Sequence, residues 1–374
     1  MISYDPYDIW STKFLGRLKV LYTEGKLFSK IIVLFFGVAE LIAPIVLRKL
    51  LRVRKSQFAH VEAMMQLSRM KKIDLSSFSE TAVISNPGIS WGLPFKWYSK
   101  NGVYDSNTGY ITNTPYVMEA LISQNWKDNE QAPAKEMFLR TWEYLQSLKI
   151  LHENSDELAL SYAVIDEPYT VVNANSYSAL AYALHAVHGK NENKEVSIIK
   201  VTKIINWIIG QQNSDGSWYY YADKQSGNFI DCFHSCFIIK NLIKVKKLLP
   251  QLSEIIDPVV MSGWEFIDSN FYDEKKMLCQ RFVEKDLSDP FVWDLYDQAE
   301  YLGLLVDFGM YEKAALMTDT IEKKFHNNNN WYCRIDFFGR KWGKNFMRWG
   351  IVPFFYHRSR LNQALANSDA TCVE

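Results

Sequence analysis

The residues best placed to do chemistry are Asp231 and His234, which follow a loop rich in turn-forming and aromatic residues. The segment Gln211 to Phe237 reads QQNSDGSWYYYADKQSGNFIDCFHSCF. Its Ser-Asp-Gly turn predicts the end of one helix, and its Trp-Tyr-Tyr-Tyr run predicts a short strand. At i and i+3 of a helix start, both side chains can reach one rim, where a histidine beside a carboxylate can act as a general base. Alternatively, Asp231 caps the helix and His234 bonds a loop carbonyl.

Amide and guanidinium side chains elsewhere can bind a charged substrate. Asn173 and Asn175 precede a predicted helix, and Arg348 begins the last one. A carboxamide and a guanidinium can share the carboxylate of a uronic acid, and so stabilise the enolate-like state formed when the C5 proton leaves. The alternatives are that Asn175 caps its helix and that Arg348 pairs with a loop acid.

A third group lies on one face of a predicted helix, because Asp294, Asp297 and Gln298 are spaced i, i+3 and i+4. A carboxylate of this helix facing another, such as Asp231 or Asp105, would suit glycoside hydrolysis, where the separation of the carboxyl groups decides between inversion and retention. The helix therefore offers Asp297 as a catalytic candidate and Gln298 as a binding candidate.

Aromatic residues are abundant, with 12 Trp, 21 Tyr and 22 Phe. Flat rings serve as stacking platforms for sugars, although a large helical core buries such rings equally well. We take Trp97, Trp218 and Trp349 as candidate platforms. Tyrosine hydroxyls are candidate proton donors for a lyase or epimerase, Tyr220 foremost, with Tyr219, Tyr221 and Tyr296 as alternatives.

Helical periodicity dominates from Thr114 onward, in two alternating kinds of segment. Segments rich in small, aromatic and polar residues are predicted inner helices: Thr114–Ser123, Asn175–Val187, Asp231–Leu242, Val292–Phe308 and Arg348–Ala364. Segments with ordinary amphipathic faces are predicted outer helices: Ala132–Leu148, Val196–Gln211, Leu252–Ser269 and Glu312–Phe325. Long loops follow outer helices and precede inner ones, so they gather on one face: Leu151–Asn173, Asn213–Ile230, Asn270–Pro290 and Asn327–Met347.

A helix pair recurring about every sixty residues predicts an all-α protein, an α/α toroid with short aromatic β-hairpins in the loops of one face. We expect one domain over residues 1–374, in which 1–75 close the ring and 76–374 form the repeated hairpins. The helices around Lys26–Leu51 and Ser56–Lys71 would complete the ring, and an open α-solenoid is the alternative. The residues expected to line a central cavity are Tyr116, Tyr177, His234, Asp297 and Arg348.

The segment Ile31–Leu47 is apolar apart from Glu40, with Pro44 inside it. It is slightly short for a bilayer span and carries an acid near its centre, so we expect a buried helix. The basic residues that follow predict peripheral contact with an anionic membrane through Arg48–Lys55: Arg48, Lys49, Arg52, Arg54 and Lys55.

Charge and cysteine content restrict the partners. Lys+Arg and Asp+Glu both number 42, so no charge imbalance favours nucleic acid. The five cysteines are odd in number and widely spaced, and no signal peptide is evident, which favours the cytoplasm, at most peripheral to the inner membrane: Cys232, Cys236, Cys279, Cys333 and Cys372. We expect no metal site and no cofactor, because no zinc-type ligand pair accompanies Cys232 and Cys236.

Six segments resemble signature segments of bacterial proteins from gene clusters for exopolysaccharide, capsule or O-antigen synthesis, which are similar to the six-hairpin glycosidase and terpenoid-cyclase toroids. The segments are YDPYDIW (4–10), WGLPFKW (91–97), VVNANSYSAL (171–180), QQNSDGSWYYY (211–221), IDCFHSCF (230–237) and MRWGIVPFFY (347–356). The chain departs from the pattern at Lys96, where an acid is usual, and around His234, which an Asn and a Thr commonly flank.

The resemblance implies a protein of surface-polysaccharide biosynthesis that acts on a uronic-acid-bearing or lipid-linked glycan as an epimerase, lyase or hydrolase. Its partner would be an oligosaccharide or a lipid-linked glycan. One alternative is a non-catalytic saccharide-binding or assembly factor that uses the same cleft.

The other alternative is an isoprenoid-handling toroid of the prenyltransferase or cyclase kind. The run Gln212–Trp218 resembles the Q-x-x-D-G-x-W loop of squalene-cyclase repeats, but the sequence has no D-x-D-D motif. A prenyltransferase-like zinc set would need Asp231, Cys232 and His357. Adjacent residues lie about 100° apart around a helix, so Asp231 and Cys232 cannot easily share a metal ion.

Overall fold

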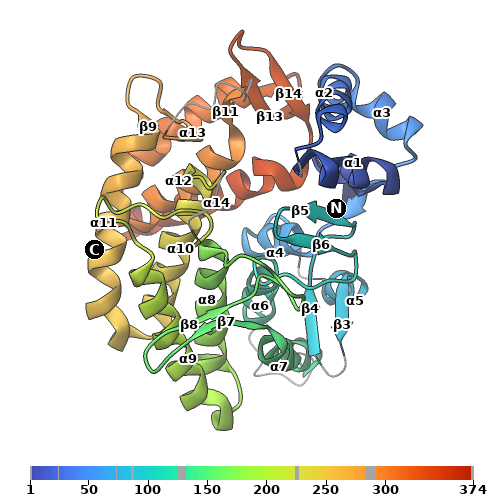
Figure 1. Cartoon of the computed structure of the whole chain (residues 1–374). Coiled ribbons are helices and arrows are strands. Elements are labelled where there is room, and N and C mark those ends of the chain that lie inside the picture. Colours follow the sequence, from blue (N-terminus) through green and yellow to red (C-terminus); the bar gives the residue numbers. More distant parts are fainter. Residues whose placement is uncertain are drawn as a thin grey trace.

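The computed structural model describes residues 2–23, 25–72, 74–85, 88–124, 132–223, 227–283 and 291–371; Cys372, one of the five cysteines, lies outside these ranges. In this part of the chain, six helices form an inner ring in which each contacts the next and the last returns to the first (Figure 1). They are α4 (Ala59–Leu67), α6 (Thr114–Ile122), α8 (Val172–His188), α10 (Cys232–Leu248), α12 (Leu295–Asp307) and α14 (Val352–Thr371).

A second layer of helices packs outside this ring, each against the inner helix that precedes it in the chain. They are α5 (Leu75–Glu80), α7 (Ala132–Ser147), α9 (Asn191–Gly210), α11 (Ser253–Phe271) and α13 (Tyr311–Phe325). The two kinds of helix predicted from the sequence thus occupy two layers, with boundaries that differ by a few residues.

The two layers differ in composition because they differ in burial. In α8, every residue from Val172 to Ala186 is buried, and Ala and Ser between the aromatic residues let neighbouring helices approach on all sides. In α13, buried residues such as Met317 and Ile321 follow one stripe, and charged residues occupy the solvent side. The aromatic-rich sequences therefore lie at the centre of the molecule.

The strands are short, antiparallel and mostly confined to the loops. They are β1 (Ile2–Ser3), β2 (Ser56–Gln57), β3 (Ala82–Ser85), β4 (Gly88–Trp91), β5 (Trp97–Ser99), β6 (Gly102–Tyr104), β7 (Ile150–Glu153), β8 (Leu158–Leu160), β9 (Tyr272–Asp273), β10 (Leu278–Cys279), β11 (Phe291–Asp294), β12 (His326–Asn327), β13 (Asn330–Asp336) and β14 (Lys341–Lys344). The strand predicted at Trp218–Tyr221 is wrong, since only Tyr221 forms an isolated bridge, with Val171. The side chain of Asn228 bonds both the N–H and the C=O of Tyr221, so the loop is held without a ladder.

The N-terminal helices stand beside the ring rather than in it. After a 3₁₀ turn at Asp8–Ser11 come α1 (Lys13–Thr23), α2 (Leu27–Ile42) and α3 (Pro44–Leu50), which share a small apolar cluster of their own. Of the segments expected to complete the ring, α4 lies within it, whereas α2 and α3 lie outside (Figure 1).

The prediction that Ile31–Leu47 is a buried helix is wrong. Ile31, Leu34 and Ile42 are 65%, 67% and 74% exposed, because one face of the helix packs on α1 and the opposite face is equally apolar but uncovered. Among the described residues, no single helix is long and apolar enough to cross a bilayer. Only α2 and α3 together are, and the chain bends by 119° between them.

Candidate active site

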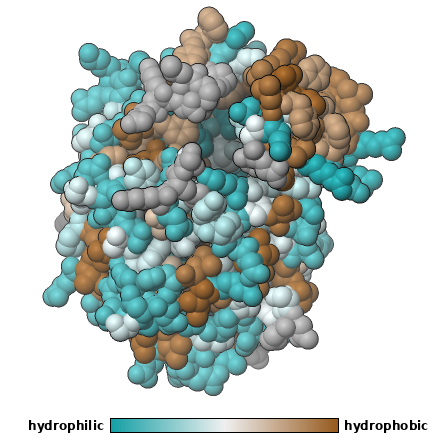
Figure 2. All heavy atoms as spheres, viewed as in Figure 1, coloured by the Kyte–Doolittle hydropathy of each residue, from teal (hydrophilic) through white to brown (hydrophobic). Residues whose placement is uncertain are grey.

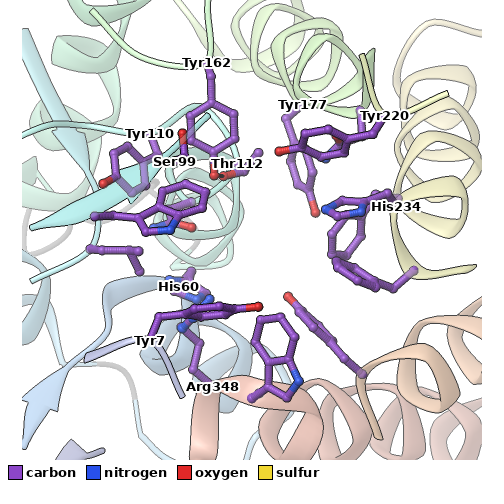
Figure 3. Close-up of a pocket in the computed structure, with 18 of the residues that line it drawn as sticks. Tyr7, His60, Ser99, Tyr110, Thr112, Tyr162, Tyr177, Tyr220, His234 and Arg348 are labelled. Carbon is purple, nitrogen blue, oxygen red and sulfur yellow. Dashed lines mark hydrogen bonds between the residues drawn. The ribbon is translucent and has the colours of Figure 1, made fainter. Parts of the chain in front are cut away.

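A cavity of about 290 Å³ lies where the N-terminal ends of the inner helices meet the loops (Figure 3). His60, Asn173, His234 and Tyr296 all belong to the first turn of their helices. The loops add Tyr110, Thr112, Tyr162, Tyr220, Phe229 and Arg281. Helix N-termini carry partial positive charge, so this arrangement favours a ligand group that is negative or becomes so.

Asp231 and His234 form a hydrogen-bonded pair at the start of α10. Asp231 caps the helix by accepting from the N–H of His234 at 3.3 Å, and its two oxygens lie 2.8 Å from His234 Nδ1. The carboxylate is buried, whereas 21% of the His234 side chain is exposed toward the cavity (Figure 3). Donation from Nδ1 to Asp231 leaves Nε2 with a lone pair, the form needed in a general base. The cap and the base-orienting group are thus the same residue.

Aromatic rings surround this pair. The ring of Tyr220 lies 4.5 Å from that of His234 and stacks on Phe229 at 4.9 Å, while burial raises the pKa of Tyr220 well above its usual value. Phe233 stacks on Tyr296 at 5.0 Å. The predicted platforms Trp97 and Trp349 also line the cavity, as do the predicted residues Tyr116 and Tyr177.

Tyr7, His60 and Arg348 form the wall opposite His234 (Figure 3). Arg348 contacts the cavity and also donates two hydrogen bonds to the carboxylate of Asp5, one of them from Nη2 at 2.9 Å. Burial opposes the charge of Arg348, but the Asp5 carboxylate raises its pKa. Arg348 therefore pairs with a loop acid, as one interpretation of the sequence expected, and also borders the cavity, as the other expected.

His60 is expected to stay neutral throughout the physiological range. Burial, and then the charge of Arg348, lower its pKa to about 3. Its neutral form stabilises folding fully above the unfolded pKa of 6.5, and this contribution is lost as the pH falls toward 3. In a ¹H–¹⁵N NMR titration, we expect the His60 ring signals not to move between about pH 5 and 8. The His60→Gln spectrum assigns them, and movement with a midpoint near 6.5 would contradict this burial.

Four buried polar atoms of the cavity wall have no hydrogen-bond partner among the described residues: His60 Nδ1, Tyr110 Oη, Asn113 Nδ2 and Asn173 Oδ1. An unpaired buried polar group is costly, so native proteins rarely keep several in one place without a ligand or water to pair them. These atoms are buried in the wall, whereas the aromatic rings that face the cavity suit the apolar face of a sugar.

Arg281 joins the cavity to three carboxylates behind its wall. Its guanidinium nitrogens lie 3.2 Å from Asp294, 3.8 Å from Asp297 and 3.9 Å from Asp231. Asp297 was expected to line the cavity, but it is fully buried and accepts from the N–H of Phe233 at 3.1 Å. Burial raises the pKa of Asp297 well above its usual value. Its place is that of a support for the start of α10.

Two residues predicted to bind substrate, Asn175 and Gln298, form hydrogen bonds within the fold instead. Asn173 and Asn175 lie within α8 rather than before it, and only Asn173 reaches the cavity. Asn175 accepts from the N–H of Leu160 and donates to the C=O groups of Leu160 and Val171, which uses both ends of its amide. Gln298 likewise bonds the N–H and the C=O of Cys279.

Trp218 also lies outside the cavity. Its indole donates to the C=O of Ile208 at 3.1 Å and packs on Gly263, where an added Cβ would stand 2.5 Å from the ring. The Trp218 ring packs the loop between α9 and α10 against α11 of the outer layer, because it fills the space beside Gly263.

Several cavity residues had no role assigned from the sequence, notably Tyr7, His60, Tyr162 and Arg281. Tyr7 belongs to the YDPYDIW segment, so a signal existed there. His60 and Arg281 stand in segments without a recognisable motif, and only the packing of α4 and of the loop after α11 brings them to the cavity.

No protein-family model and no curated protein sequence matches this chain. Solved structures do match over most of its length. Cellobiose 2-epimerase from Bacillus thermoamylovorans is 12% identical, with a TM-score of 0.57 over 84% of this chain and 90% of that one. A D-mannose isomerase gives a TM-score of 0.58 at 11% identity over 83% and 86% of the chains. The chain has the α/α-toroid fold.

A further structure of this toroid fold is a family 76 α-mannanase from Bacteroides thetaiotaomicron, with a TM-score of 0.54 at 11% identity over 84% and 88% of the chains. The predicted fold class is therefore confirmed, and the closed inner ring replaces the open solenoid. At these identities the likeness shows the fold, and the chemistry has to be argued from the cavity.

Proposed function

We propose that this protein is a carbohydrate-active enzyme that moves a proton on a sugar ring, as an epimerase or a lyase does. The observation that carries the proposal is the Asp231–His234 pair, whose histidine faces a cavity lined with aromatic rings. The toroid structures with similar folds include a cellobiose 2-epimerase and a D-mannose isomerase, which supports the same class of substrate here.

The geometry suits removal of a proton from a carbon next to a carbonyl or carboxyl group. His234 Nε2 takes the proton, Asp231 stabilises the resulting imidazolium, and negative charge develops on the substrate oxygen. Helix N-termini and the guanidinium groups of Arg281 and Arg348 favour that charge. Return of a proton to the opposite face gives epimerisation, whereas departure of the β-substituent with its electron pair gives the unsaturated lyase product.

Hydrolysis receives less support, because the predicted carboxylates are occupied elsewhere. A glycosidase needs two carboxyl groups flanking the scissile bond. Asp231 is bound to His234, Asp297 lies behind the wall, and Asp105 is 62% exposed at the surface, where it pairs with Lys96 at 2.8 Å.

A role in surface-polysaccharide biosynthesis is supported by where the six signature segments fall. Each contributes to the cavity wall: Tyr7, Trp97, Asn173, Tyr220, His234 and Arg348 come from the six segments in order. The segments that carry the resemblance therefore meet at one cavity in this chain. The proposed substrate is therefore a uronic-acid-bearing or lipid-linked glycan.

The test is deuterium exchange into sugars in D₂O, followed by NMR. A panel of hexoses, hexuronic acids and short oligosaccharides containing them distinguishes the positions at which exchange occurs. We expect solvent deuterium at a carbon adjacent to the carbonyl or carboxyl group of one sugar class, either in an epimer or beside an unsaturated product. Binding without exchange or cleavage would instead assign the cavity to a saccharide-binding or assembly factor.

A further inference from the structure

The outward face of α2 and α3 carries an apolar stripe that the fold leaves uncovered. Figure 2 shows it as a hydrophobic patch beside a hollow in the molecular surface. The exposed members recur every three or four residues along α2 and continue on α3: Leu27, Phe28, Ile31, Leu34, Phe35, Val38, Ile42, Ile45, Val46 and Leu50. The opposite face of α2 packs on α1, so the helix is apolar on both sides. Such an all-round apolar helix implies a second apolar environment.

In the described part of the first 55 residues, the exposed charges are all basic. Among the described residues up to position 55, the carboxylates are Asp5, Asp8 and Glu40, and arginine side chains pair with all three. Exposed basic side chains remain around both helices: Lys26, Lys30, Lys49, Arg52, Arg54 and Lys55. Arg48 was expected among these surface cations, but it is fully buried and holds Asp8 and Glu40. An apolar stripe bordered by cations complements an anionic leaflet, whereas a second copy of the same surface would bring like charges together.

We propose that the α2–α3 surface inserts into one leaflet of an anionic lipid bilayer. The 16 residues of α2 span about 24 Å, less than the hydrocarbon core of about 30 Å, and the 119° bend turns α3 away from the axis of α2. Both helices therefore lie along the surface with their stripe in the acyl region and their cations at the headgroups.

The inserted helices are joined to the catalytic cavity by buried polar contacts. Arg48 of α3 bonds Asp8 and donates to the C=O of Asp5 at 2.6 Å, and the carboxylate of Asp5 holds Arg348 at the cavity wall. A continuous chain of direct polar contacts therefore links the α2–α3 surface to the cavity wall.

Two smaller cavities lie between the 290 Å³ cavity and the helix pair α2–α3, and neighbouring cavities share lining residues. One of about 190 Å³ shares Tyr7 and Arg281 with the large cavity, and one of about 60 Å³ shares Phe291 and Arg334 with the former. The last of them is lined by residues of the helix pair, Glu40, Leu41 and Pro44. This order places the sugar-binding cavity near the bilayer, which suits a glycan whose lipid carrier stays in the leaflet. That part of the inference rests on the proposed function.

Vesicle co-sedimentation tests the insertion without using the sugar reaction. We expect the full chain to pellet with vesicles of phosphatidylcholine and phosphatidylglycerol, and less with phosphatidylcholine alone. The double variant Leu34→Glu/Phe35→Glu should lower the affinity for vesicles about tenfold or more, because carboxylates then face the acyl region. Both positions are exposed, at 67% and 66%, so its thermal unfolding should match that of the unchanged protein.

The matched control is Leu316→Glu, since this leucine is 58% exposed on α13, far from the helix pair in the chain, and should leave vesicle binding unchanged. A second variant, Lys49→Gln/Arg54→Gln, should weaken binding mainly at low salt. The proposal is overturned if the protein stays in the supernatant with anionic vesicles, or if the double glutamate variant pellets as before. A dimer that the glutamates dissociate, without vesicle binding, would assign the surface to a second copy.

Discussion

His234→Ala is expected to lower turnover of the glycan substrate by about 10²- to 10⁴-fold, the contribution of a positioned general base. The side chain is partly exposed, and its one hydrogen-bonding neighbour in the described structure is Asp231. The substitution should therefore leave the fold intact and sugar affinity largely unchanged. Initial rates of deuterium exchange and isothermal calorimetry with the same sugar measure the two effects separately.

The partner variant Asp231→Asn separates capping from orientation. Asparagine is also a good N-cap, so α10 should remain, but it cannot stabilise an imidazolium and favours the wrong tautomer of His234. We expect a lower rate and a thermal midpoint close to that of the unchanged protein. The surface pair His152–Glu157, 3.0 Å apart and half-exposed, provides the control His152→Ala, which should not affect the rate. Undiminished exchange in His234→Ala would remove this histidine from the mechanism.

The largest loss of stability is expected from breaking the buried pair Lys240–Glu300, whose charged atoms lie 2.7 Å apart with both side chains buried. Removing one partner leaves an uncompensated charge, which costs about 3–5 kcal/mol. Lys240 also donates to Tyr116 at 2.8 Å, and the hydroxyls of Tyr116 and Tyr177 are 3.1 Å apart, so the network supports two residues of the cavity. Urea unfolding of Lys240→Met should show this loss, and weaker sugar binding should accompany it.

The pH dependence of this loss has a defined sign. Burial opposes ionisation of Glu300, but the charge of Lys240 lowers its pKa to about 2. The contribution of the ionised carboxylate is therefore complete above its ordinary pKa of 4.5 and is lost as the pH falls toward 2. In Lys240→Met that favourable contribution disappears, so the gap in stability between the two proteins should narrow in acid.

Two control variants test whether the loss of stability comes from the buried charge. Lys190→Met breaks a surface pair with Glu192, both more than half exposed, and should change stability little, as exposed pairs generally do. The double variant Lys240→Met/Glu300→Leu removes both charges and should be more stable than Lys240→Met alone. A Lys240→Met protein as stable as the unchanged one would show that the buried charge finds another partner.

Local sequence features determined the helices and the Asp231–His234 pair of the site. The aromatic-rich segments form helices that are buried on all sides, and the amphipathic segments form helices that are buried on one side only. Because burial determines composition, this difference is visible in the sequence. The spacing of Asp231 and His234 places them within one helical turn, so their contact follows from the chain alone.

Tertiary packing decided which polar side chains face the cavity and which serve the fold. Asn173 and Asn175 are two residues apart on α8, about 200° around the helix, so one reaches the cavity and the other bonds the backbone of Leu160. Three other cavity residues come from separate parts of the chain: Tyr7, His60 and Arg281. No local sequence pattern predicts that closure of the helical ring brings them together. The apolar sequence of α2 likewise predicts that the helix is shielded from water. Only the structure shows that one face of α2 packs on the protein and that the other face is exposed.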